Sequence, residues 1–294
     1  MSVYIIAEAG VNHNGSSRKA FELVDAALAA GADAVKFQTF TADSLVRKGA
    51  RKAAYQQSET GEGDQYSMLK ELELGHDLHR DLIKYCDGIG IEFISTGFDE
   101  NSVNFLVELG VRRLKVPSGE LTNLPYLRHV ADKNLPTILS TGMGTLEEVG
   151  EAVKVFQEAK PKGGVTDPLP QRLTILHCTS NYPTALLDVN LLAMQTMAEN
   201  FGLPVGYSDH TSGILIPPVA VAMGASVIEK HFTFSKNMYG SDAKHSMEPK
   251  EFKIFCKEVK DTWDMISNPV DKNDVTIYSK MKTIFQKSIV AKHD

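Results

Sequence analysis

Two histidines in this 294-residue chain follow short apolar runs that lie close together in the sequence: His210 ends VGYSDH and His231 ends VIEKH. If both runs are neighbouring parallel strands, the two imidazoles lie roughly 4.8 Å apart in the pairing direction. Two histidines with few other protein ligands leave open coordination positions, which is typical of a catalytic divalent metal rather than a closed structural site. For each histidine alone, the other interpretation is a hydrogen bond to a backbone carbonyl, and the pairing favours the metal.

Two lysines interrupt apolar runs: Lys36 lies in DAVKFQ and Lys115 in RRLKV. A buried ammonium group needs a partner, and one interpretation pairs each lysine with a neighbouring carboxylate. The other gives both lysines a strongly anionic substrate with phosphate and carboxylate groups, assisted by serine hydroxyls at other strand ends. These serines are Ser118, Ser140 and Ser208. Two such lysines favour an organophosphate site.

Carboxylates occupy similar positions. Glu229 and His231 are two residues apart on one strand, so they share a face, while Ile228 and Phe232 face the opposite side. If Glu229 and His231 point into a barrel, Ile228 and Phe232 pack against outer helices.

Two further glutamates, Glu8 after the first apolar run and Glu120 after the fourth, are candidates for acid–base groups or for binding substrate hydroxyls. Their spacing does not separate these two roles.

The elements that must position these side chains alternate between short β-branched runs and longer amphipathic segments. The expected strands are VYIIAE, DAVKFQ, EFIST, RRLKV, PTILST, LTILHCT, LPVGYSD and SVIEKHF, and the expected helices span about 17–30, 78–88, 102–109, 124–133, 145–159, 189–199, 214–223 and 251–265. Eight strand–helix pairs in a chain of this length predict a parallel (β/α)8 TIM barrel, in which chemistry takes place at the carboxyl ends of the strands.

Helix-start signals support this organisation. Thr145 and Glu148 form a predicted capping box before an apolar stripe. The preceding GMG sequence lacks the third glycine of a dinucleotide fingerprint, so a tight strand-to-helix turn explains Gly142 and Gly144.

Composition excludes several classes of protein. The net charge is −6 and no long Lys/Arg run occurs, so a nucleic-acid surface is not expected. The first apolar run, 3–7, stops at Glu8 and is too short for a signal peptide or a membrane span. Three widely separated cysteines predict free thiols and a cytoplasmic protein.

Two segments break the alternation. Residues 41–75, after the second strand, form a long insertion of the kind that often makes a lid or binding loop. Residues 269–294 form a tail with a short apolar run, Ile289–Ala291, that has no remaining element to pair with. We therefore predict a catalytic barrel over 1–268 and a C-terminal linker or tail over 269–294.

Eight ordered motifs, IAEAGVNHNG, VKFQTF, FISTGFD, KVPSGE-TNLP, ILSTGM, LHCTSNYPT, VGYSDHT and EKHFT, resemble the sialic acid synthases and related nonulosonate-forming enzymes. The resemblance covers nearly the whole chain. It implies a barrel that condenses phosphoenolpyruvate with the aldehyde of an open-chain N-acetylmannosamine-type sugar and uses a divalent metal, most often Mn²⁺, with Mg²⁺ or Co²⁺ as alternatives. It also implies a homodimer.

The resemblance also implies roles for individual residues. His210 and His231 match the metal ligands. The positions that hold phosphoenolpyruvate are matched by Lys36, Thr96, Lys115, Ser118, Ser140 and Ser208, with Ser180 and Asn181 as further candidates. The sugar positions are matched by Gln38, Glu120, Tyr182 and Asp242, and the catalytic positions by Glu8, Glu120, Glu229 and Asp242. In the implied reaction, metal and Asp242 polarise the aldehyde, C3 of the enolpyruvate attacks it, water adds to C2, and phosphate leaves with C–O cleavage.

The chain departs from the family pattern in three places. Many members read Gly-Pro-Asp-His-Lys-Ala where residues 240–245 read GSDAKH, so a histidine is displaced. Ser180 stands where some sialic acid synthases have Asn, and Asn181 follows it. Most members continue past a segment resembling KSIVAKHD into an antifreeze-like domain, so we expect either a truncation or a one-domain form. Gly119 resembles the sialic or legionaminic type more than the pseudaminic type.

The same residues also fit other functions. Within the family, a legionaminic acid synthase or a synthase for phosphorylated mannose fits the same motifs, and octulosonate- and heptulosonate-phosphate synthases share the reaction type. A class I aldolase would instead use Lys36 or Lys115 as a Schiff-base amine. A non-catalytic sugar-binding barrel would bind ligand without turnover.

Overall fold

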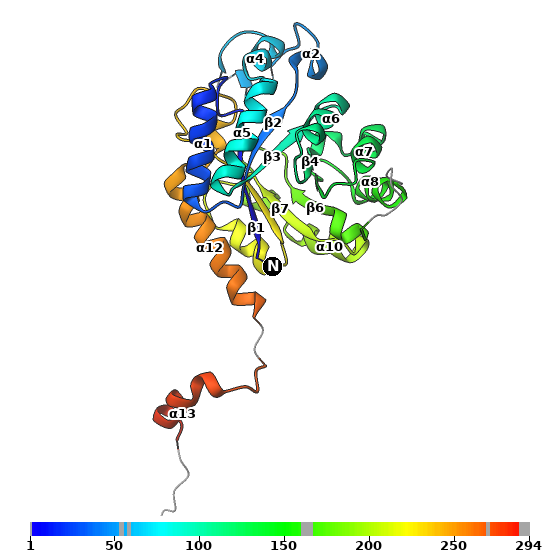
Figure 1. The fold of residues 1–294 in the computed structure, drawn as a ribbon. Coiled ribbons are helices and arrows are strands. Elements are labelled where there is room, and N and C mark those ends of the chain that lie inside the picture. Colours follow the sequence, from blue (N-terminus) through cyan, green and yellow to red (C-terminus); the bar gives the residue numbers. More distant parts are fainter. Residues whose placement is uncertain (1, 53–55, 58–59, 160–166, 269–270, 288–294) are drawn as a thin grey trace, which may run out of the picture.

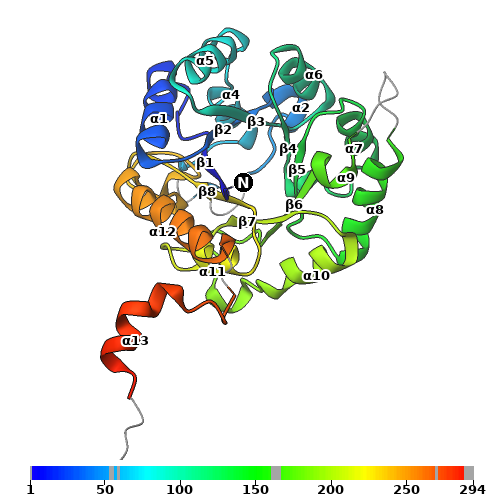
Figure 2. The same ribbon diagram turned by 60° about the horizontal axis from the view of Figure 1, so that its bottom comes forward.

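A computed structural model describes residues 2–52, 56–57, 60–159, 167–268 and 271–287 of the chain. Its centre is a closed barrel of eight parallel strands in chain order, in which β8 pairs back onto β1 (Figures 1 and 2). The strands are β1 (Tyr4–Gly10), β2 (Ala34–Thr39), β3 (Glu92–Gly97), β4 (Leu114–Val116), β5 (Thr137–Ser140), β6 (Leu173–Cys178), β7 (Val205–Asp209) and β8 (Val227–His231). The predicted TIM barrel is confirmed.

A ring of helices surrounds the barrel, one after each strand (Figure 2). They are α1 (Ser17–Ala30), α5 (His76–Ile89), α6 (Glu100–Glu108), α7 (Leu124–Ala131), α8 (Leu146–Glu158), α10 (Leu192–Phe201), α11 (Ile216–Ala222) and α12 (Pro249–Ser267). Each predicted helix is present with ends within about one helical turn of those expected. None of the helices in the described part of the chain has the length and apolar character needed to cross a membrane.

Shorter helices lie in the connections between these elements. They are α2 (Ala42–Leu45), α4 (Gln65–Glu71), α9 (Leu169–Arg172) and α13 (Ser279–Phe285), together with 3₁₀ turns at Ser118–Glu120, Leu186–Asp188, Ala243–His245 and Thr276–Tyr278.

The barrel interior changes character along its axis. Its amino-terminal half is a small apolar core made of Ile6, Ala34, Ile94, Ile138, Leu176 and Val227. Two residues further along each of these six strands, on the same face, the side chain is polar or a thiol: Glu8, Lys36, Thr96, Ser140, Cys178 and Glu229. The strands therefore deliver their reactive groups to one end of a packed interior.

The larger core lies between the strands and the helices. Ile228 and Phe232 belong to this core, as their alternation with Glu229 and His231 predicts. Phe232 packs edge-on against Phe252 of α12, with ring centroids 4.9 Å apart. Packing on this outer side fixes the backbone from which Glu229 and His231 project inward.

The turn before α8 has the predicted form. Thr145 accepts a hydrogen bond from the backbone N–H of Glu148, and the Glu148 carboxylate accepts one from the backbone N–H of Thr145. A Cβ atom on Gly142 would lie 2.4 Å from Ser180 Oγ and 2.9 Å from Ser118 Oγ. Close packing among cavity residues therefore requires this glycine, and a dinucleotide fingerprint is not needed to explain it.

The insertion and the tail differ in their packing. The insertion carries α2 and α4 at the carboxyl end of the barrel, near the ends of β2 and β3 (Figure 1). Helix α13 of the tail lies apart from the barrel in both views (Figures 1 and 2), and none of its residues is buried. The run Ile289–Ala291 lies outside the described residues, and the division at 268/269 stays a prediction.

Candidate active site

A cavity of about 570 Å³ lies at the carboxyl ends of the strands. Fourteen of the predicted site residues line it: Glu8, Lys36, Gln38, Thr96, Lys115, Ser118, Ser140, Ser180, Tyr182, Ser208, His210, Glu229, His231 and Asp242. The structure therefore gathers side chains from every strand or the loop that follows it into one chamber, as the position rule for such barrels predicts.

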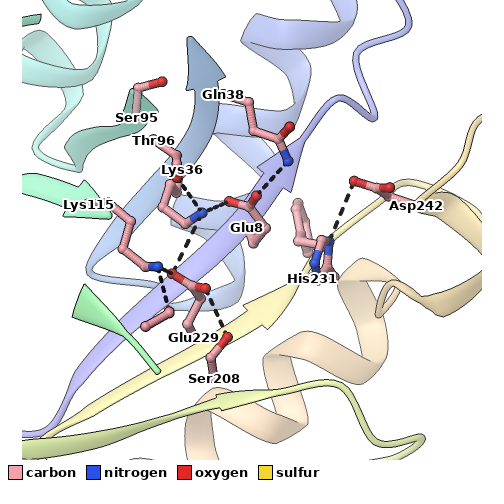
Figure 3. A network of polar contacts seen from close by, with 12 residues as sticks. Glu8, Lys36, Gln38, Ser95, Thr96, Lys115, Ser208, Glu229, His231 and Asp242 are labelled. Atoms are coloured by element: carbon pink, nitrogen blue, oxygen red, sulfur yellow. Dashed lines mark hydrogen bonds and ion pairs between the residues drawn. The ribbon is translucent and has the colours of Figure 1, made fainter. Parts of the chain in front are cut away.

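Two lysines and two glutamates form a buried cluster in this cavity (Figure 3). Lys36 Nζ lies 2.7 Å from Glu8 Oε2, 3.7 Å from Glu229 Oε2 and 3.1 Å from Thr96 Oγ1. Both lysines are less than 5% exposed. Each lysine thus has the carboxylate partner of the first interpretation, and both ammonium groups also line the cavity that the second interpretation requires.

Lys115 is the second lysine of the cluster. Its Nζ donates to Ser140 Oγ at 2.7 Å and to the carbonyl of Val116 at 3.1 Å, and lies 3.9 Å from Glu229 Oε2. Ser208 donates to the other oxygen of Glu229 at 2.9 Å. Glu229 is therefore the shared counter-ion of both lysines, held in place by a serine from the neighbouring strand (Figure 3).

The two buried glutamates have opposite acidities. Burial raises the pKa of Glu8 to about 7, although Lys36 opposes this. Burial also disfavours the charge on Glu229, but Lys115 and Lys36 outweigh it and lower its pKa to about 2. Glu229 is thus a permanent anion at neutral pH, whereas Glu8 can give or take a proton there.

The lysines respond to the same two glutamates. Burial disfavours the charge on Lys36, and Glu229 and Glu8 more than compensate, so its pKa is raised. Burial lowers the pKa of Lys115, and its more distant contact with Glu229 opposes this only in part. When Glu8 is protonated, two ammonium groups face one carboxylate, and the surplus charge favours an anionic ligand.

The two predicted metal ligands lie side by side. The rings of His210 and His231 have centroids 5.7 Å apart and both line the cavity. His210 Nδ1 lies 2.7 Å from the carbonyl of Thr179, and because a carbonyl only accepts, Nδ1 carries the proton and Nε2 keeps its lone pair. Burial lowers the pKa of His210 to about 4 and also lowers the pKa of His231. Both rings are thus neutral, the form that binds metals.

Further observations test the fit of a metal here. Nδ1 of His231 is buried without a hydrogen-bond partner, and Asp242 Oδ2 lies 3.9 Å from it (Figure 3). Within the described residues, no group of three or more His, Cys, Asp or Glu side chains is arranged to hold a metal. The residues fit an open two-histidine site that leaves positions for substrate, and they do not form a closed cage.

A glycine allows close packing of two carboxylates at the end of β1. Gly10 has φ +52°, and a Cβ atom there would lie 3.1 Å from Asp242 Oδ2 and 3.2 Å from Glu8 Oε1. Gln38 donates to that same Glu8 oxygen at 3.2 Å. The sequence therefore needs a glycine where the strand passes between Glu8 and Asp242.

Comparison with known proteins agrees with this arrangement. Residues 23–271 match the NeuB family. The chain belongs to the NeuB family. One relative, an N,N'-diacetyllegionaminic acid synthase of Legionella pneumophila, is 51% identical over 298 residues, covering 100% of this chain and 81% of that protein. A Campylobacter jejuni protein of the same name is 46% identical, covering 99% of this chain and 85% of that protein.

Solved structures show the same family likeness. An N-acetylneuraminic acid synthetase from Leptospira borgpetersenii superposes with a TM-score of 0.81 at 31% identity, covering 96% of this chain and 91% of that one. A truncated 3-deoxy-D-arabino-heptulosonate 7-phosphate synthase from Thermotoga maritima gives a TM-score of 0.65 at 17% identity, covering 92% and 89%, which shows the shared barrel fold alone.

Two predicted residues of this NeuB family chain lie off the cavity wall. Glu120 is not among the lining residues, and its carboxylate accepts a hydrogen bond from Asn123 at 2.7 Å. Asn181 also does not line the cavity, and its carbonyl accepts from the hydroxyl of Thr184. Their functional roles stay predictions. The turn that carries Asn181 directs the flanking Ser180 and Tyr182 inward instead.

Other wall residues were not singled out from the sequence as parts of the site. Cys178 contacts Ser118 at 3.2 Å, and its position two residues after inward-facing Leu176 is the alternation signal that would have found it. The displaced His245 of the NeuB family motif still lines the cavity. The insertion contributes an apolar side of the chamber, and its role as a lid or binding loop stays a prediction.

Proposed function

We propose that this chain is a nonulosonic acid synthase that condenses phosphoenolpyruvate with the aldehyde of an acylamino sugar and releases inorganic phosphate. The observation that carries the proposal is the buried pair of lysines sharing Glu229 beside two neutral histidines, in a member of the NeuB family. The names of the 51% and 46% identical relatives favour the legionaminic type.

Phosphoenolpyruvate carries the phosphate and carboxylate that two ammonium groups suit. Lys36 and Lys115 would bind it, with hydroxyl donors from Ser118 and Ser140 on the same wall. Thr96 and Ser208 hold Lys36 and Glu229 in position from the neighbouring strands. The cluster is preorganised by its own ion pairs, so little rearrangement is needed when the anion binds.

His210 and His231 would hold the divalent metal, with Asp242 next to them. When bound, the metal supplies a Lewis acid that polarises the sugar aldehyde. Manganese as the native metal, a homodimer and a cytoplasmic location are further predictions from the family resemblance.

The reaction forms a C–C bond to the aldehyde and a C–O bond to water, and it breaks the C–O bond to phosphate. C3 of phosphoenolpyruvate attacks the aldehyde carbon, whose oxygen takes a proton and becomes a hydroxyl. Water then adds to the cationic C2 and loses its first proton. The C2–O bond to phosphate breaks as the new hydroxyl loses its second proton, so phosphate leaves with that proton and C2 becomes a ketone. Glu8, with its pKa of about 7, accepts the proton of this water, and Glu229 stays charged and stabilises the cationic centre.

A single assay tests the proposal. The protein is mixed with phosphoenolpyruvate, Mn²⁺ and a panel of acylated and plain mannose-type sugars, free and 6-phosphorylated, and phosphate release is followed with and without EDTA. We expect release that depends on an acylamino sugar and stops with EDTA. Absence of release with every sugar would refute the synthase, and release unaffected by EDTA would refute the metal. Borohydride trapping with pyruvate would instead identify a Schiff-base aldolase.

A further inference from the structure

One side of the active-site cavity is apolar and comes largely from the insertion. Six residues both line the cavity and belong to one small hydrophobic cluster: Val11, Leu45, Met68, Leu69, Leu72 and Phe98. We call these six residues the apolar wall. It is separate from the main core, and it faces the same space as the lysines and histidines. The chamber therefore has one polar and one apolar side.

The insertion is fastened to the barrel at several points. The carboxylate of Glu73 accepts the backbone N–H of Ala42 at 2.6 Å, which ties the end of the insertion to its start. His79, just beyond it, bonds to the hydroxyl of Thr39 at 2.8 Å, and Thr39 bonds to Ser95 at 2.7 Å. These contacts fix the apolar wall relative to the ends of β2 and β3.

A contact from the far side of the cavity also reaches the insertion. The hydroxyl of Tyr239, in the loop after β8, donates to the carbonyl of Thr60 at 3.1 Å. The insertion thus meets the loop that carries Asp242, and the apolar wall lines the same cavity as Asp242.

The chemistry of the apolar wall selects its ligand. Phosphate, carboxylate or sugar hydroxyls placed against it would lose water without gaining hydrogen bonds. A methyl group would gain from burial there. Gln65, one turn before Leu69 on α4, donates to the side-chain oxygen of Gln56 at 3.4 Å, and both glutamines line the cavity. An apolar patch bordered by amide groups is complementary to an acylamido group.

We infer that the apolar wall binds the acyl methyl group of the sugar and selects acylamino sugars over plain ones. This assignment rests on the proposed sugar acceptor and adds the residues that recognise its substituent. Leu69 of α4 is the most useful residue to change, because it lines the cavity and is only partly buried, so its truncation removes contact area with limited damage to the fold.

The experiment measures binding separately from turnover. The probes are the reduced, open-chain forms of N-acetylmannosamine and of mannose, which lack the reactive aldehyde, and their dissociation constants are measured by calorimetry. We expect the wild-type chain to bind the acetylated probe about tenfold more tightly than the plain one, and Leu69→Ala to lose most of this preference. In turnover, Leu69→Ala should raise KM for acylated sugar more than it lowers kcat.

Matched controls distinguish the apolar wall from the rest of α4. Tyr66 is on α4 with Leu69 but does not line the cavity. Tyr66→Phe removes its hydrogen bond to Asp43 of α2 and should keep the preference. Leu69→Met keeps an apolar contact and should also keep it. If Leu69→Ala melts at a much lower temperature than the wild-type chain, Leu45→Ala, on α2 of the insertion, gives a second test.

Equal binding of the two probes by the wild-type chain would overturn the inference, as would an unchanged preference in both alanine variants. If the wild-type chain releases no phosphate with any sugar but still prefers the acetylated probe through Leu69, the proposed synthase fails and the apolar wall stands.

Discussion

The two halves of the barrel interior are formed by the same faces of the same strands, yet one half is apolar and the other is charged. Ile6 and Ile94 belong to a tightly packed apolar layer, whereas Glu8 and Thr96, two residues further along, belong to a charged and hydrogen-bonded cluster. A step of roughly 7 Å along each strand separates the two. Burial of apolar side chains in the amino-terminal half stabilises the fold, whereas the carboxyl-terminal half holds charges that burial disfavours.

Substitutions in the two halves should therefore have different effects. A change in the apolar layer should reduce stability and leave the chemistry of the folded molecules intact. A change in the charged cluster should remove activity and alter stability in a way that depends on which charges remain. Substitutions in the two halves test this separation.

Lys36→Met should have the largest effect. It removes an ammonium group that faces the substrate cavity, and we expect phosphate release to fall by about 1000-fold or more, because phosphate recognition and stabilisation of charge are both lost. It also leaves Glu8 and Glu229 without their shared partner, so stability should fall as well. Phosphate release and urea unfolding measure the two effects.

Lys230→Met is the matched control for this lysine. Lys230 is 2% exposed and its Nζ lies 2.6 Å from Asp209 Oδ2, but it does not line the active-site cavity. Its substitution breaks an equally buried ion pair, so it should destabilise the chain while the folded fraction keeps its activity. The separation of roles would be wrong if the two variants lost activity to the same degree. The double variant Lys36→Met with Glu8→Gln should regain stability but not activity.

Ile94→Ala tests the apolar half. Ile94 is fully buried in the amino-terminal layer, so we expect a loss of about 2 to 5 kcal/mol in the free energy of unfolding from lost burial and the cavity left behind. The kcat of the folded protein should stay close to that of the wild-type chain. A large fall in kcat without a change in the unfolding midpoint would show that the apolar layer positions the charged cluster directly.

His231→Ala tests the metal prediction. We expect about a 100-fold loss of Mn²⁺-dependent phosphate release and a matching loss of Mn²⁺ affinity, measured by electron paramagnetic resonance of the free ion. His177→Gln is the control, since His177 bonds to the carbonyl of Val189 and does not line the cavity. If both variants bound Mn²⁺ as the wild-type chain does, His231 would not be a ligand.

Strand alternation was enough to predict much of this site. Glu229 and His231 point inward because Ile228 and Phe232 need the helix-side core, and the same period places Lys36 above Ala34. Convergence of His210 and His231 followed from the expected neighbouring strands. These features depend on local periodicity and on the closed parallel order, both of which the sequence pattern contains.

Features that depend on contacts between distant segments were harder to predict from the sequence. The apolar wall combines residues of the insertion with Val11 and Phe98, and no periodicity links them. The sequence left open whether Glu8 acts in acid–base chemistry, because its acidity depends on burial and on Lys36 and Glu229 together. Glu120 and Asn181 were expected at the site on family resemblance. Neither residue lines the cavity, and their roles stay predictions.

The smallest expected effect is a change in the pH dependence of stability on replacing Glu8. Its pKa is raised from 4.5 to about 7, so between these values the folded chain retains a proton that the unfolded chain has released. Stability should therefore fall as pH rises from 4.5 to 7, by on the order of 2 kcal/mol. Glu8→Gln cannot release a proton and should flatten this fall in urea unfolding measured across the window.

Glu229→Gln should behave in the opposite way, which makes it the control for the same cluster. Its pKa is lowered from 4.5 to about 2, so Glu229 contributes stability that is present above pH 4.5 and lost as pH falls toward 2. The glutamine variant should flatten that acid limb. Because the charge of Glu229 helps to raise the pKa of Glu8, the variant should also lessen the fall between pH 4.5 and 7 without abolishing it. If the stability of Glu8→Gln fell by the same amount between pH 4.5 and 7, Glu8 would be ionised across that range. Another group would then have to accept the proton of water near neutral pH.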